Sequence, residues 1–153
     1  AGPSIVDMLA NAALAIGLAK LMQKRIRDLL PAIPFTYCVA NFYRAAQKGL
    51  DAELFWPSLE QSQPEYFSVA SILDKLLPDV PEQLHSMGFV EADYQPLLDI
   101  VNERLQTRQT GAEWQLQKLA ALRKDLHKRE ALLEMLKQYQ RNSAANIPVS
   151  QWQ

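Results

Sequence analysis

"SIVDMLANAALAIGLAKLMQKRIRDLL", residues 4–30, decides the fold class of this chain. Its apolar residues recur mainly at intervals of three or four, the spacing of one helical face: Met8, Ala12, Ile16 and Ala19. Ser4 is a good N-cap, and Asp7 suits the positive end of a helix. We therefore predict a long helix over residues 5–30, ended by the prolines of "PAIPF" because proline cannot continue the helical hydrogen bonds.

The same helix is apolar on nearly all sides between Leu9 and Leu18. A helix of this kind is usually buried, so we expect it at the centre of the fold. Its basic residues come at its end, the reverse of a signal peptide. No apolar run approaches the length needed to span a bilayer, so we expect no membrane partner.

The rest of the chain also has helical patterns. Proline, glycine and serine mark the ends of these segments, which we place at residues 37–49, 68–77, 81–88 and 91–106. "WPSLEQSQPEY", residues 56–66, is predicted to be a loop, and no strand pattern is strong. The predicted fold class is all-α: a single multi-helix domain with two long helices.

The last helix is predicted over residues 110–141. Thr110 and Glu113 have the spacing of a capping box. Leucines then follow at heptad-like positions: Leu119, Leu122, Leu126, Leu133 and Leu136. The 113–141 helix is therefore a candidate surface for a homo-oligomer. We divide the chain into a helical domain, residues 1–141, and an irregular C-terminal tail, residues 142–153.

Composition narrows the function classes. A chain of 153 residues is long enough for one domain with a real core. A single cysteine, Cys38, excludes an internal disulfide and indicates a reducing, cytoplasmic compartment. His85 and His127 lie far apart with no cysteine partner, so no metal site is predicted. The net charge is −1, although residues 51–107 hold eleven Asp and Glu against two Lys and Arg. This weak overall charge argues against a nucleic-acid partner.

A polar stripe lies in "NFYRAAQKGLDAELFWP", residues 41–57. On a helix, Asn41, Arg44 and Lys48 share one face. One amide and two cations can hold a phosphate or a carboxylate. The same stripe can equally be the solvated side of a helix, paired with Asp51 and Glu53. The spacing alone favours the solvated side.

The order of these segments resembles the C-terminal part of the type-two glutamate–cysteine ligase-like family of carboxylate–amine ligases. "AGPSIVDMLANAALAIGLAKLM" resembles its apolar helix and "ILDKLLPDVPEQLHSMG" its "L-L-x-x-L-x-P" segment. "LQTRQTGAEWQL" resembles its late "G-x-x-x-x-Q" helix entry. The stretch from residue 41 matches the family's motif helix at five positions: Asn41, Ala45, Gly49, Leu50 and Asp51. The resemblance covers residues 3–120.

The resemblance implies an enzyme that forms an amide bond with ATP and Mg²⁺ through an acyl phosphate. It implies that this chain is the helical part of a larger α+β enzyme, with a preceding catalytic sheet domain in the same polypeptide as its partner. The acidic metal ligands belong to that sheet, so we expect this chain alone to be inactive. The candidate residues for nucleotide or substrate phosphate are Asn41, Arg44 and Lys48.

Two residues depart from the family's pattern. The family's motif arginines fall on Phe42 and Gln47 in this sequence. Arg44 and Lys48 lie one or two positions away, and each position turns the side chain by about 100° around a helix. Either these cations reach the same ligand from a shifted helix, or the anion site has been lost. The alternative function is therefore a non-catalytic helical interaction module.

Overall fold

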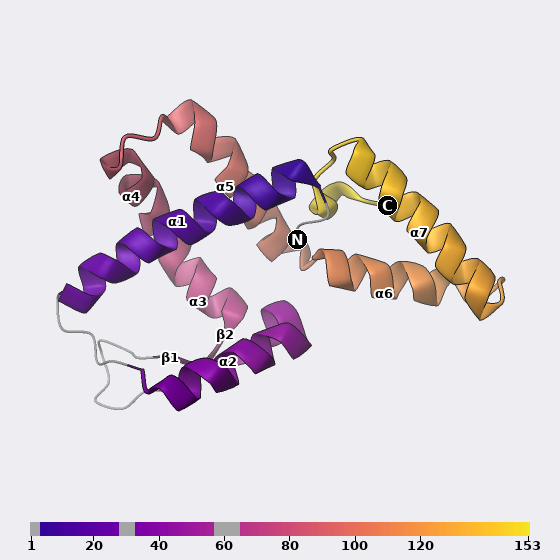
Figure 1. Ribbon diagram of the computed structural model, residues 1–153, viewed down its shortest axis with the longest axis horizontal. Helices are drawn as coiled ribbons and strands as arrows, with labels where there is room; N and C mark the ends of the chain where they lie inside the picture. Colours follow the sequence, from indigo (N-terminus) through magenta and orange to yellow (C-terminus); the bar gives the residue numbers. More distant parts are fainter. Residues whose placement is uncertain (1–3, 28–32, 57–64) are drawn as a thin grey trace. The chain divides into compact units, whose positions relative to one another are not determined.

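The computed structural model describes residues 4–27, 33–56 and 65–153 (Figure 1). The described part of the chain is predominantly helical, as predicted, with one small two-stranded sheet. These residues form two compact units, each described by itself below. One unit contains the described residues of Leu14–Glu91, and the other contains those up to Ala13 together with Ala92–Gln153.

Helix α1 (Ile5–Arg27) begins at the predicted cap. The Ser4 hydroxyl donates to Oδ2 of Asp7 at 2.6 Å and accepts from the Asp7 backbone N–H at 3.2 Å. Residues 28–30 of the predicted helix lie outside the described residues.

The expectation that α1 is buried at the centre of the fold is wrong, because one side of the helix is exposed. Ala10, Ala13, Gly17 and Leu21 are buried, but Ile5, Met8, Leu9 and Ile16 are between 42% and 64% exposed. The prediction that no segment is apolar enough to cross a membrane is also wrong. Residues Ile5–Arg25 meet that test by length and composition. Asp7 and Lys20 are the two charges in residues 5–22, so this 18-residue window keeps a high mean hydropathy.

In the unit of Leu14–Glu91, the core forms where α1 meets α3 (Val69–Leu76). Leu21, Ile72 and Leu76 are its buried members, and Leu54 and Phe67 of the sheet pack against them. The Ser68 hydroxyl caps α3 by accepting from the Ser71 backbone N–H, as predicted. A 3-10 turn (Leu77–Asp79) and α4 (Val80–Ser86) follow.

Helix α2 (Phe35–Lys48) ends at Gly49, whose φ of 54° belongs to the left-handed region that glycine adopts easily. Strands β1 (Glu53–Trp56) and β2 (Glu65–Ser68) follow and pair antiparallel, with Phe55 opposite Tyr66. The prediction that residues 56–66 form a loop is wrong at its two ends, which belong to these strands. Four-residue strands are too short to give a clear period-two pattern. Residues 57–64 lie outside the described residues.

The other unit contains α5 (Glu91–Thr107), α6 (Gly111–Leu122) and α7 (Lys128–Ala144), with α6 and α7 side by side (Figure 1). The capping box of Thr110 and Glu113 is confirmed. The prediction of one helix over residues 110–141 is wrong, because residues 123–127 form a turn. The turn ends at His127, which is extended and donates its backbone N–H to Glu130 Oε2 at 3.2 Å. This bond caps a new helix.

The core of this unit forms between α6, α7 and the C-terminal segment. Trp114, Met135, Val149 and Trp152 are its buried members, and Leu119 and Leu122 pack against it. Leu119 therefore faces this core, and the leucines do not form one continuous seam. The prediction of an irregular tail is also wrong in part. Helix α7 continues to Ala144, and Val149–Gln151 form a 3-10 turn beside the buried Trp152.

Candidate functional site

The motif helix α2 packs on β1 through Asn41. Its Nδ2 donates to the carbonyl oxygen of Phe55 at 2.8 Å, and its Oδ1 accepts from the Phe55 backbone N–H at 2.8 Å. Both hydrogen-bonding groups of Phe55 therefore point away from β2 and toward α2. The amide of Asn41 replaces a neighbouring strand at this point. Asn41 thus joins α2 to β1.

Arg44 also contacts the sheet. Its guanidinium carbon lies 4.5 Å from the centre of the Tyr66 ring, a cation–π contact. Its Nη1 lies 3.5 Å from the carbonyl oxygen of Glu53, a long hydrogen bond. The same side of α2 carries Tyr37, whose ring stacks on Phe55 at a centroid distance of 3.9 Å. Asn41 and Arg44 thus lie together on the sheet side of α2.

Lys48, the third candidate residue, lies in the last turn of α2 and is exposed. It suits the negative end of the helix dipole. The structure therefore brings Asn41 and Arg44 together on the hairpin and leaves Lys48 in solvent. Phosphate binding by these three residues stays a prediction.

The opposite side of α2 is apolar and uncovered. None of the helix's residues is buried. Phe35 is 79% exposed, Phe42 70% and Tyr43 61%. Cys38 is also exposed. Phe42 and Gln47, at the positions of the family's arginines, are both exposed. An aromatic surface of this kind usually marks a contact with another apolar surface.

A buried charged cluster stands at the start of α1. Asp7 is fully buried, and its carboxylate accepts from the Val149 backbone N–H at 3.2 Å. The Nε of Arg104 lies 4.0 Å from Asp7 Oδ1, and its Nη1 donates to Asn11 at 2.9 Å. Burial lowers the pKa of the Arg104 guanidinium, and the Asp7 carboxylate acts in the opposite direction. Sequence reasoning treated Asp7 only as a helix-end charge and missed this cluster.

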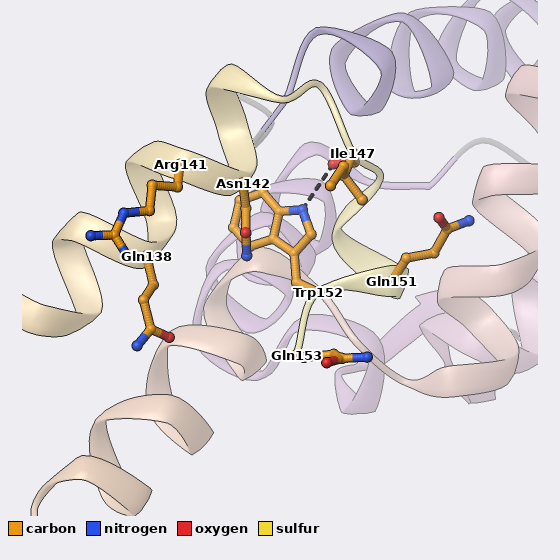
Figure 2. A pocket seen from close by; sticks show the side chains of 7 residues that line it. All are labelled: Gln138, Arg141, Asn142, Ile147, Gln151, Trp152 and Gln153. Atoms are coloured by element: carbon orange, nitrogen blue, oxygen red, sulfur yellow. Dashed lines mark hydrogen bonds between the residues drawn. The ribbon is translucent and has the colours of Figure 1, made fainter.

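A surface hollow of about 390 Å³ lies beside α7 (Figure 2). Arg141 and Gln138 extend from the helix on one side, and Gln151 and Gln153 stand on the other. Trp152 lies between them, and its Nε1 donates to the carbonyl oxygen of Ile147 at 2.8 Å. Gln138 and Gln151 donate to Glu134 and Glu103. These side chains do not converge on one point, so the hollow does not define a ligand site. No sequence motif marks it.

In the part of the chain that the structure describes, no three His, Cys, Asp or Glu side chains could together hold a metal ion. Comparison with protein-family models, with curated proteins and with solved structures finds no match for this chain. The resemblance to carboxylate–amine ligases therefore remains a hypothesis based on the sequence motifs.

Proposed function

We propose that this chain is the helical C-terminal portion of a glutamate–cysteine ligase-like carboxylate–amine ligase, inactive as this portion alone. The observation that carries the proposal is the uncovered aromatic side of α2. This is the helix with the family's motif, and its apolar side faces solvent at Phe35, Phe42 and Tyr43. An apolar helix side needs a partner, and the preceding catalytic sheet of such an enzyme would supply one.

The order of the motifs supports the same proposal. The apolar helix, the motif helix, the "ILDKLLP" segment and the "GAEWQL" entry follow one another as in that family. In the structure they fall on α1, α2, α3 and α6. Each motif thus coincides with a helix or its beginning.

In this proposal the parts of α2 have different tasks. Asn41 is a positioning residue that joins the helix to β1. Arg44 is held over Tyr66, where its remaining N–H groups would face a phosphate. Lys48 is exposed and would reach an anion without rearrangement. Phe42 would pack on the catalytic sheet.

The residues described here do not fit a Mg²⁺ site, because they include no cluster of metal-ligating side chains. Any magnesium ligands would belong to the preceding sheet. ATP and Mg²⁺ are therefore expected for the longer enzyme and not for this chain alone.

The test uses the product of the complete gene. It is incubated with ATP, Mg²⁺, glutamate and a panel of amines, and phosphate release and the amide product are measured. We expect ATP-dependent amide formation that Phe42→Glu abolishes and that Leu116→Glu leaves intact. Leu116 is the matched control, because it is 69% exposed on another helix.

Lys48→Gln is the second variant. We expect a higher KM for ATP with unchanged helix content, because the side chain is exposed. A complete gene product that releases no phosphate with any amine would contradict the ligase proposal. Equal activity of the wild type and the Phe42→Glu variant would contradict the role given to α2.

One observation favours the alternative, a non-catalytic interaction module. Leu133 and Leu136 are 50% and 55% exposed on the outer side of α7. They are what remains of the predicted oligomer surface after the break at residues 123–127. Sedimentation at high concentration tests this alternative. Self-association that Leu133→Glu with Leu136→Glu removes would support it, and a monomer at all concentrations would contradict it.

A further inference from the structure

The outward side of α1 is apolar where a helix of a soluble protein is normally polar. Ile5 is 64% exposed, Met8 and Leu9 are each 50% exposed, and Ile16 is 42% exposed. Ala12, Ala15 and Ala19 are exposed beside them. At 100° per residue these positions lie on one side of the helix. We call this surface the α1 apolar face: Ile5, Met8, Leu9, Ala12, Ala15, Ile16 and Ala19.

One ordinary explanation of such a helix does not apply. A core helix of a soluble protein is mostly buried, but only 28% of the apolar window of α1 is buried.

The other side of α1 packs against other parts of the protein. Asp7 is fully buried and bonded to the backbone of Val149. Gly17 is buried against Val80. A helix that crossed a membrane would carry these packed partners into the hydrocarbon. These contacts are compatible with a helix that lies along a membrane surface with one side in the acyl chains.

The charges beside the apolar face point to the kind of membrane. Lys20 stands at the edge of this face, one residue after Ala19, and Lys24 follows one turn later and is exposed. Arg25 is already paired with Asp79 at 3.0 Å. Within the described residues the structure gives Lys20 and Lys24 no ion pair. Cations beside an apolar helix face attract anionic lipid headgroups.

We propose that the α1 apolar face, with Lys20 and Lys24, docks this protein on the surface of an anionic lipid membrane. The face from Ile5 to Ala19 extends about 21 Å along the helix axis, at 1.5 Å per residue. This proposal does not depend on the ligase activity, and its test measures no catalysis.

The first experiment is co-sedimentation of the wild-type chain with vesicles. One set is phosphatidylcholine alone, and the other contains about 30% phosphatidylserine. We expect binding to the anionic vesicles that weakens about tenfold at high salt, because salt screens the attraction between the lysines and the phosphatidylserine headgroups. No binding to the anionic vesicles at low salt would overturn the proposal.

The variant Met8→Glu with Ile16→Glu places two carboxylates on the apolar face. We expect vesicle affinity to fall by tenfold or more. The matched control is Leu116→Glu with Val90→Glu, at positions 69% and 61% exposed and outside α1. It adds the same charge and should bind vesicles as the wild type does. Equal binding of the two double variants would overturn the proposal.

The basic end is tested by Lys20→Gln with Lys24→Gln. We expect weaker binding to phosphatidylserine vesicles and no change with phosphatidylcholine alone. Unchanged binding to both kinds of vesicle would show that Lys20 and Lys24 do not attract anionic headgroups, and it would overturn the proposal.

A further variant reports the insertion directly and does not depend on the stability of the acidic ones. In the Ile16→Trp variant, brominated acyl chains should quench the fluorescence of the added tryptophan. In the Gln117→Trp variant, on α6, they should not. Equal quenching of the two would overturn the proposal. Concentration-dependent dimers without vesicle binding, abolished by Met8→Glu with Ile16→Glu, would also overturn it and would assign the face to a second copy of this chain.

Discussion

Asn41 closes the outer edge of β1 by bonding both backbone groups of Phe55, each at 2.8 Å. A two-stranded sheet is marginal alone, and its free edges need partners. This amide therefore supplies a partner for the outer edge of β1 at Phe55.

The first prediction concerns this amide. Asn41→Ala should lower the free energy of unfolding by about 1–3 kcal/mol, because the Phe55 N–H and C=O lose their partners. Asn41→Asp should cost at least as much, because a carboxylate cannot donate to the Phe55 carbonyl oxygen. Urea denaturation followed by circular dichroism measures both.

Gln47→Ala is the control for the Asn41 variants, since Gln47 is exposed on the same helix. It should change the free energy of unfolding by no more than about 0.5 kcal/mol. Equal effects of Asn41→Ala and Gln47→Ala would contradict the role given to Asn41.

The second prediction concerns Gly17. A Cβ at this position would lie 2.4 Å from Cγ1 of Val80, closer than two carbon atoms can pack. Gly17→Ala should therefore lower the free energy of unfolding by about 1–3 kcal/mol, although alanine is the better helix former. Thermal denaturation measures the change. Adding Val80→Ala to Gly17→Ala should recover part of the loss, and no recovery would contradict close packing as its cause.

Local sequence signals identified the described helices well. Ser4, Ser68 and Thr110 cap their helices by accepting a hydrogen bond from the backbone N–H three residues later. Such a bond is local and needs no tertiary contact, so the sequence alone can predict it. The break at residues 123–127 was missed because its cap is His127, whose backbone N–H bonds to Glu130. The sequence pattern of leucines continues across that break.

The candidate site depended more on tertiary contacts. Helical spacing correctly placed Asn41 and Arg44 on one side of α2, but could not show that this side meets β1. That contact joins residues 14 positions apart, and the sheet itself has no clear sequence pattern. The cluster of Asp7, Arg104 and Val149 joins residues up to 142 positions apart. No local pattern contains that information.

The third prediction concerns Trp152, in the segment that sequence reasoning treated as irregular. The centroid of its ring lies 5.0 Å from the centroid of the Trp114 ring, in an edge-to-face arrangement. Trp152 is 5% exposed. Trp152→Ala should lower the free energy of unfolding by about 3–5 kcal/mol and reduce the near-ultraviolet circular dichroism. Leu116→Ala, at an exposed position, should change it by no more than about 0.5 kcal/mol. A small effect of Trp152→Ala would show that the segment does not contribute to the core.

The fourth prediction concerns the buried pair of Asp7 and Arg104. Asp7→Asn should lower the free energy of unfolding by about 2–4 kcal/mol, since Arg104 would lose its carboxylate and Val149 its charged acceptor. Arg104→Gln should lower the free energy of unfolding by less, because Asp7 keeps its hydrogen bonds to Ser4 and Val149. A double-mutant cycle should give a coupling free energy of about 1 kcal/mol. Additive effects would indicate that the two side chains act independently.

The pH dependence of this pair follows from Arg104. Burial lowers its pKa in the folded chain below the unfolded value, so between these two values the folded state binds fewer protons. Stability contributed by this group therefore rises with pH within that window, and the window lies in the alkaline range where arginine titrates. Between about pH 5 and 9 arginine stays protonated in both states, so Arg104→Gln should cost the same free energy throughout. Urea denaturation of the wild type and the variant at several pH values tests this. If the difference in free energy of unfolding between the wild type and Arg104→Gln changed with pH across this range, another group of the cluster would have to titrate near neutral pH.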